Sequence, residues 1–276
     1  MSNHLPMSSG PSGMRYPQSH KWILVAVAAV ASAAMFSVPR IPQDLLYHQF
    51  SDARVVFGIQ NFWNVVTNLP FLIVGLTGLM LHFGGGARPV PAALRSGYVV
   101  FLVGVTLVGA GSACYHYAPS TAMLAWDRLP MTVAFMALFA VVIADGLAEA
   151  HAGKFLWLFI LSGVGSIGYW HVTEAGGAGD LRPYVLVQFL PLILIPLTLI
   201  LYGTKYLRAG FLWATLGAYF LAKMAEHYDP VLYNLTGVLS GHSIKHLLAS
   251  LAAFCVVMAF KGYSTAGEDR RQRHQG

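Results

Sequence analysis

Eight apolar stretches, each close to the length needed to cross a bilayer, constrain the fold of this sequence more than any other feature. They lie near residues 22–39, 62–83, 97–117, 129–148, 155–171, 183–203, 209–226 and 240–260. A transmembrane helix needs about 20 consecutive, mainly apolar residues. Because backbone polar groups within lipid must bond inside their own segment, such runs predict helices. We therefore expect an all-α, polytopic transmembrane bundle with a seven-helix core and one extra N-terminal helix.

The composition indicates that lipid surrounds most of the chain. Only 10% of the residues are charged and 56% are hydrophobic, whereas soluble domains carry about a quarter charged residues. The net charge of +6 follows from where the basic residues lie, so we expect no nucleic-acid partner. Nothing in the sequence predicts an obligate protein partner. We expect a disordered tail over 1–20, one transmembrane domain over 21–262 and a cytoplasmic tail over 263–276.

The placement of the basic residues favours one orientation. If all eight runs span and the N-terminus is cytoplasmic, eleven of the 17 Lys and Arg residues fall on the cytoplasmic side. Cytoplasmic loops carry such an excess in membrane proteins. We therefore expect both termini in the cytoplasm. The run 22–39 could instead be a cleaved signal peptide, but its long polar leader favours a retained helix.

Three polar segments at the ends of these runs fall on the same, non-cytoplasmic face. Residues 111–116 end one run, 126–131 open the next, and 240–246 open the last. Ionisable groups at membrane depth are costly, so their positions point to function. The side chains of interest are Ser112, His116, Asp127, His242 and His246.

These residue types suit a catalytic zinc site. His242 and His246 are four residues apart, so their rings share one face of a helix. With His116 they give three imidazoles, and catalytic zinc sites have three protein ligands and an open position. Such an ion lowers the pKa of a bound water towards neutrality. Asp127 could accept that water's proton, and Ser112 could bind an oxyanion or orient Asp127.

Simpler interpretations of the same residues exist. A histidine at a helix end is often only interfacial, and Asp127 with Arg128 could be a structural ion pair. A serine hydrolase triad of Ser112, His116 and Asp127 would lack a Gly-x-Ser-x-Gly motif and leave the other two histidines unused. A transporter should show repeated halves or broken helices, and we detect no internal repeat.

The spacing of these residues resembles that of a known family. The order Ser112, His116, Asp127 and a distant His242-x-x-x-His246 is similar to the alkaline ceramidases. That family belongs to a superfamily of membrane hydrolases that includes the adiponectin receptors. The segment 61–68 resembles the opening of the family's first helix, and the resemblance covers roughly residues 50–262. The resemblance implies a seven-helix core that holds Zn²⁺ on the three histidines.

The resemblance also implies an activity. Members hydrolyse the amide bond of ceramide-like N-acyl lipids, releasing a fatty acid and a long-chain base, so the expected partner is a membrane lipid substrate. A receptor-like or signalling protein with weak hydrolysis is the alternative. Tyr115, Glu226 and Lys245 are expected close to the metal ligands or the substrate. Lys245 could reach a lipid phosphate or extend to the interface. Asn61 replaces an acid that helps to bind calcium in relatives, so we expect no calcium site.

Overall fold

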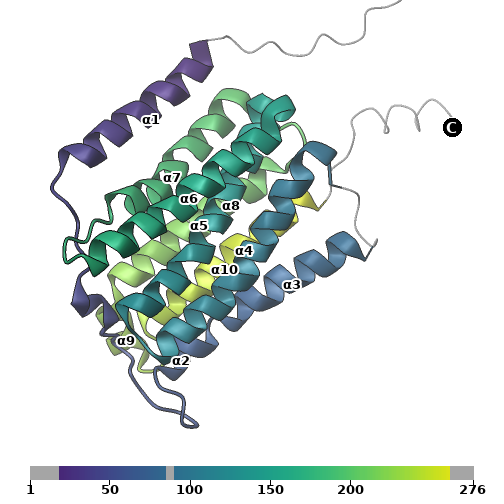
Figure 1. Cartoon of the computed structure of the whole chain (residues 1–276). Coiled ribbons are helices and arrows are strands. Elements are labelled where there is room, and N and C mark those ends of the chain that lie inside the picture. Colours follow the sequence, from purple (N-terminus) through teal and green to yellow (C-terminus); the bar gives the residue numbers. More distant parts are fainter. Residues whose placement is uncertain (1–18, 85–89, 262–276) are drawn as a thin grey trace, which may run out of the picture.

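The computed structural model describes residues 19–84 and 90–261, and this described part is helical with no strand. Its long helices lie side by side in one bundle (Figure 1). The helices are α1 Ser19–Ser37, α2 Phe62–Val66, α3 Leu69–Phe83, α4 Ala92–Tyr117, α5 Thr121–Ile143, α6 Ala152–Ala175, α7 Arg182–Tyr202, α8 Ala209–His227, α9 Asp229–Thr236 and α10 Gly241–Phe260. The expected all-α bundle is confirmed. The predicted tails, 1–20 and 263–276, lie outside the described residues, apart from residues 19 and 20, which belong to α1.

Six segments of the described chain are long and apolar enough to cross a membrane. They are His20–Ser37, Phe62–Phe83, Ala92–Tyr117, Thr121–Ala175, Arg182–Tyr202 and Gly241–Phe260. The fourth is 55 residues long and contains α5 and α6, which turn back on each other around residues 144–151. Helix α8 is not among the six. Segments of this kind are typical of an integral membrane protein.

The helix bounds differ from the predicted runs at places that matter for the site. Helix α5 begins at Thr121, eight residues before the run 129–148, because the Ser120 hydroxyl accepts a 3.2 Å hydrogen bond from the Met123 backbone and caps the helix. Asp127 therefore lies within α5 and not before it. The run 62–83 is divided into α2 and α3 at residues 67–68, and the short α9 was not predicted.

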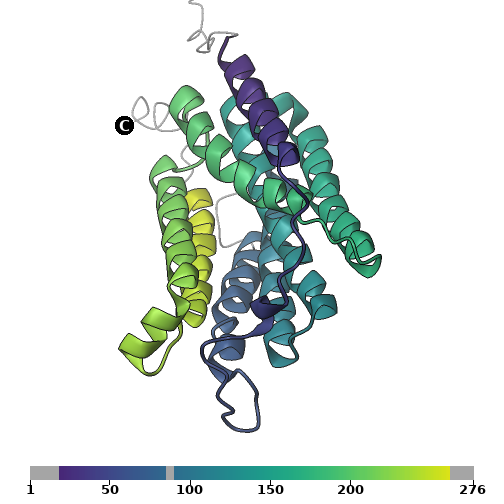
Figure 2. The same cartoon turned by 90° about the vertical axis from the view of Figure 1, so that its left-hand side faces the viewer.

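The arrangement of the helices places the polar run ends together. The start of α1 and the end of α10 lie at one end of the bundle, whereas α2 and α9 lie at the other (Figure 1). Helix α1 lies at the edge, against α7. Helices α8 and α10 form a tight pair that packs on the rest mainly through α3 (Figure 2). This pair brings the histidines of α10 towards α4.

Two glycines allow close backbone approach at the level of the polar run ends. A Cβ on Gly241 would overlap the carbonyl oxygen of Ala225, so the start of α10 lies directly against α8. A Cβ on Gly111 would lie 2.6 Å from the carbonyl oxygen of Trp126, so α4 and α5 touch there as well. These contacts set the distance between the helices that carry the site.

Candidate metal centre

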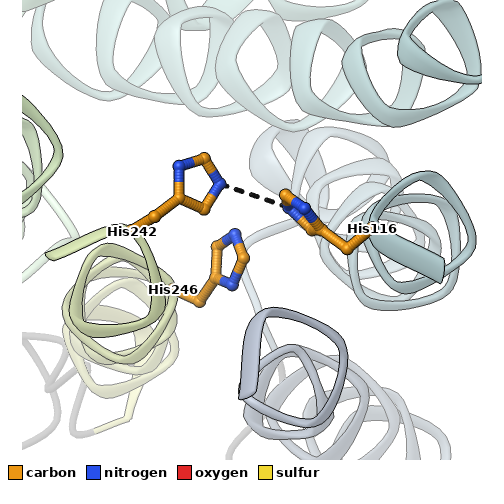
Figure 3. A group of neighbouring side chains, drawn as sticks. All are labelled: His116, His242 and His246. Atoms are coloured by element: carbon orange, nitrogen blue, oxygen red, sulfur yellow. Dashed lines mark hydrogen bonds between the residues drawn. The ribbon is translucent and has the colours of Figure 1, made fainter. Parts of the chain in front are cut away.

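Three buried histidines from two helices converge at the α2 and α9 end of the bundle. His116 comes from α4, and His242 and His246 come from α10; their side chains point towards one another (Figure 3). They are 1%, 6% and 3% exposed, respectively. One ligand nitrogen from each lies within 4.8 Å of the others. The described part of the chain therefore contains a group that could hold a metal ion.

The hydrogen bonds of His246 fix which of its nitrogens is free. The Thr67 hydroxyl oxygen lies 2.6 Å from the carbonyl oxygen of Trp63 and 3.0 Å from Nδ1 of His246. Because a hydroxyl has one hydrogen and a carbonyl cannot donate, Thr67 donates to Trp63 and accepts from Nδ1–H. Nε2 of His246 then carries the lone pair, and it is buried with no hydrogen-bond partner among the described residues. A buried lone pair without a partner is available to bind a metal ion.

The other two rings also fit a shared cation. Nε2 of His116 and Nε2 of His242 are 3.3 Å apart, and Nδ1 of His116 is buried without a partner among the described residues. Two ring nitrogens at this distance can share a proton, as an N–H···N hydrogen bond, or a cation. Three neutral nitrogen donors suit Zn²⁺, so the residues present fit the ion that the sequence predicts.

Polar side chains near the α2 end hold the ligands in place. A carboxylate oxygen of Asp229 accepts a 2.7 Å hydrogen bond from the backbone N–H of His242 at the start of α10. The Asn61 amide donates to the carbonyl oxygen of His116, at 2.8 Å. Asn64 is fully buried and accepts from a serine hydroxyl of α10 at 2.7 Å. These bonds tie α4, α2 and α10 together around the histidines.

The segment before α2 covers the histidines from outside the bundle. The Phe50 ring lies 4.7 Å from that of His116 and 5.2 Å from that of His242, between centroids. Tyr115, expected close to the ligands, packs its ring on His116 and bonds the imidazole of His48 through its hydroxyl, at 2.9 Å. Burial, with a smaller effect of a nearby arginine, lowers the pKa of His48 below its usual range. The His48 imidazole beside Tyr115 is therefore harder to protonate than a free imidazole.

A cavity of about 220 Å³ adjoins His246. Ser112, Asp127 and His246 line it together. Asp127 is 8% exposed, and its Oδ1 has no hydrogen-bond partner among the described residues. Its carboxylate interacts with the Ser112 hydroxyl. A buried carboxylate with one unbonded oxygen that faces a cavity is placed to accept a proton from a bound molecule.

Lys245 and Glu226 also line this cavity. The Lys245 ammonium lies 2.9 Å from Oε1 of Glu226 and 3.0 Å from Nε2 of His242. Glu226 also forms an ion pair with Lys223, three residues earlier on α8. The Lys245 side chain is only 19% exposed and lines the cavity.

Sequence reasoning did not identify Thr67 and Phe50 as neighbours of the histidines. Their partners lie far along the chain, 179 residues away for the contact of Thr67 with His246. The one available signal was the polar segment 61–68 at the start of an apolar run.

Comparison with known proteins gives a family match. Residues 54–275 match the family described as Ceramidase, and no curated protein matches the chain. The matched range includes all three histidines and the residues that line the cavity from α4, α5, α7, α8 and α10. Because it covers well over half of the sequence, the chain belongs to the ceramidase family, whose members are hydrolases of ceramide.

Proposed function

We propose that this protein is a zinc-dependent membrane amidohydrolase that cleaves the amide bond of ceramide-like N-acyl lipids. The products would be a fatty acid and a long-chain base. The observation that carries the proposal is the convergence of three buried imidazoles beside a cavity that also contains a buried carboxylate. Bound zinc would polarise the amide carbonyl and lower the pKa of a coordinated water.

Asp127 is the residue that would move protons. Its carboxylate faces the cavity from α5, next to His246, and would accept a proton from water and later deliver it to the leaving nitrogen. Ser112, one helical turn before His116 on α4, interacts with this carboxylate. We assign Ser112 the task of orienting Asp127.

A second, apolar cavity next to the first would hold the acyl chain. It lies between the α8–α10 pair and helices α3, α4, α5 and α7. Both cavities are lined by Phe71, Val108, Met131, Tyr219 and Ala249. A lipid could therefore place its amide near the histidines and its chain among apolar side chains, where burial of each CH₂ contributes about 0.8 kcal/mol.

The test is a hydrolysis assay on the purified protein in detergent. Fatty acid release from a panel of N-acyl lipids should require zinc, stop with a chelator and return with added Zn²⁺. His246→Ala should lose both the metal and the activity. Labelling of Ser112 by a serine-reactive phosphonate, with activity unaffected by the chelator, would refute the proposal in favour of a serine hydrolase.

We further propose that both termini are cytoplasmic and that the site faces the opposite side. This rests on the excess of basic residues described above and on the position of the site, at the end of the bundle away from the start of α1 (Figure 1). Phe57, which is 91% exposed in the segment before α2, offers a test. Phe57→Cys in a Cys114→Ala background should react with an impermeant thiol reagent in intact cells, and protection until lysis would contradict this orientation.

A further inference from the structure

The cavity beside the histidines contains more basic than acidic side chains. Arg128, Lys223 and Lys245 line it, against Asp127 and Glu226. A bound Zn²⁺ would add two further positive charges. Buried charge of one sign is costly unless it is paired, so this cavity favours a bound group that is negatively charged.

Arg128 is the most confined of these cations. It is 7% exposed, and its guanidinium lies 4.8 Å from the ring of Trp170, 4.9 Å from that of Tyr184 and 5.4 Å from that of Tyr47. Its Nη1 donates to the side-chain oxygen of Gln43, at 2.8 Å. These contacts hold the guanidinium plane in one orientation.

No carboxylate pairs with this guanidinium in the described part of the chain. The ion pairs there involve other basic residues, and Asp127, although adjacent in sequence, does not come within ion-pair distance. Arginine has five N–H donors in a fixed planar fork that matches carboxylate, sulfonate and phosphate oxygens. The Arg128 guanidinium is held in one orientation, has no ion-pair partner among the described residues and lines a cavity. It can therefore bind an anion.

The two lysines extend the same positive surface. Both bind Glu226, so one carboxylate serves two ammonium groups. The Tyr47 hydroxyl lies 3.4 Å from Glu226, and its ring contacts Arg128. Arg128 and the lysine pair therefore belong to one connected wall of the cavity, close to His242.

Resting on the proposed function, we propose that the preferred substrate carries an anionic group in its head, close to the amide, and that Arg128 binds this group with support from Lys223 and Lys245. The chemical class is an N-acyl lipid with a carboxylate, sulfonate or phosphate on the amine portion. A neutral head would leave the guanidinium without an ionic partner in a buried site.

Three lipids with the same acyl chain test the proposal through hydrolysis. N-palmitoylglycine and N-palmitoyltaurine are short anionic stand-ins for the amine portion of the lipid, whereas N-palmitoylethanolamine is a neutral one of similar size. The kcat/KM for the anionic lipids should exceed that for the neutral one by about tenfold or more, as expected for a hydrogen bond to a charged group. Arg128→Gln should bring this ratio towards one. Lys205→Met, which removes an exposed lysine paired with Glu149 outside the cavity, should leave the ratio unchanged.

Binding to the chelator-treated protein separates this proposal from the proposed function. Without metal, N-palmitoyltaurine should still bind at least about tenfold more tightly than N-palmitoylethanolamine, as followed by tryptophan fluorescence, since Trp170 packs on Arg128. Lys223→Met, a milder change at a partly exposed position, should reduce the preference if Arg128→Gln does not fold. Equal affinities for the two lipids would overturn the proposal. So would an Arg128→Gln variant that binds both lipids more weakly by the same factor. If the protein binds the anionic lipid preferentially but hydrolyses none of the three lipids, only the proposed amidase activity is refuted.

Discussion

Thr67→Val should weaken zinc binding although Thr67 is not expected to touch the ion. The Thr67 hydroxyl donates to the Trp63 carbonyl at 2.6 Å and accepts from Nδ1–H of His246 at 3.0 Å. It thereby holds the tautomer in which Nε2 of His246 presents its lone pair to the other two histidines. Valine has the same shape but no acceptor, so Nδ1–H would lose this partner, and the loss of a buried hydrogen bond costs up to about 1–3 kcal/mol.

That cost sets the expected loss of affinity. Partners of metal-bound histidines typically contribute 10–100-fold to metal affinity, and each tenfold change corresponds to about 1.4 kcal/mol. We expect zinc affinity, measured by competition with a chromogenic chelator, to fall by about 10–100-fold. The matched control is Thr198→Val, because Thr198 is also fully buried and bonds a carbonyl one turn earlier on its helix. Equal zinc affinities for Thr67→Val, Thr198→Val and the unmodified protein would refute the reasoning.

Asp127→Asn should lower kcat by at least about a hundredfold while metal analysis still finds one zinc per chain; loss of the zinc would instead make Asp127 part of the metal site. Gly241→Ala would force a Cβ into the backbone of α8, so Tm and zinc content should both fall. Gly210→Ala, with open space around the added Cβ, should change neither, and an unchanged Gly241→Ala protein would contradict the close packing. The Arg182 guanidinium lowers the pKa of Asp180 from 3.8 to about 2. This pair therefore stabilises the fold above pH 4 and loses its effect as the pH falls towards 2. Asp180→Asn should show a smaller drop in Tm between pH 5 and pH 3, and an equal drop in both proteins would contradict this assignment.

Much of the fold could be predicted because lipid leaves the backbone few options. Apolar runs of the right length must become helices, so each of the eight runs contains a long helix. The ends were less predictable, because a helix can continue through polar residues once its cap is satisfied. Helix α5 extends eight residues before its apolar run from the Ser120 cap, and this places Asp127 on a helix face that reaches the cavity.

The metal ligands could be proposed from spacing, whereas their surroundings could not. His242 and His246 share a helix face by periodicity alone, and His116 joins them because α4 and α10 carry it to the same end of the bundle. The segment before α2 has no apolar period to indicate where Phe50 would lie. The aromatic contacts of Arg128 come from residues in α6, in α7 and before α2. Only the tertiary structure reveals that Lys245 lines the cavity.

The division of the three ligands between α4 and α10 has a mechanical consequence. The α8–α10 pair packs on the other helices mainly through α3, yet the facing nitrogens of His116 and His242 belong to residues 126 positions apart. An ion shared by these rings would cross-link the pair to the rest of the bundle, and its binding would raise the free energy of unfolding. Removing it should loosen the two helices that form one wall of the apolar cavity, so that catalytic activity and thermal stability would be lost together.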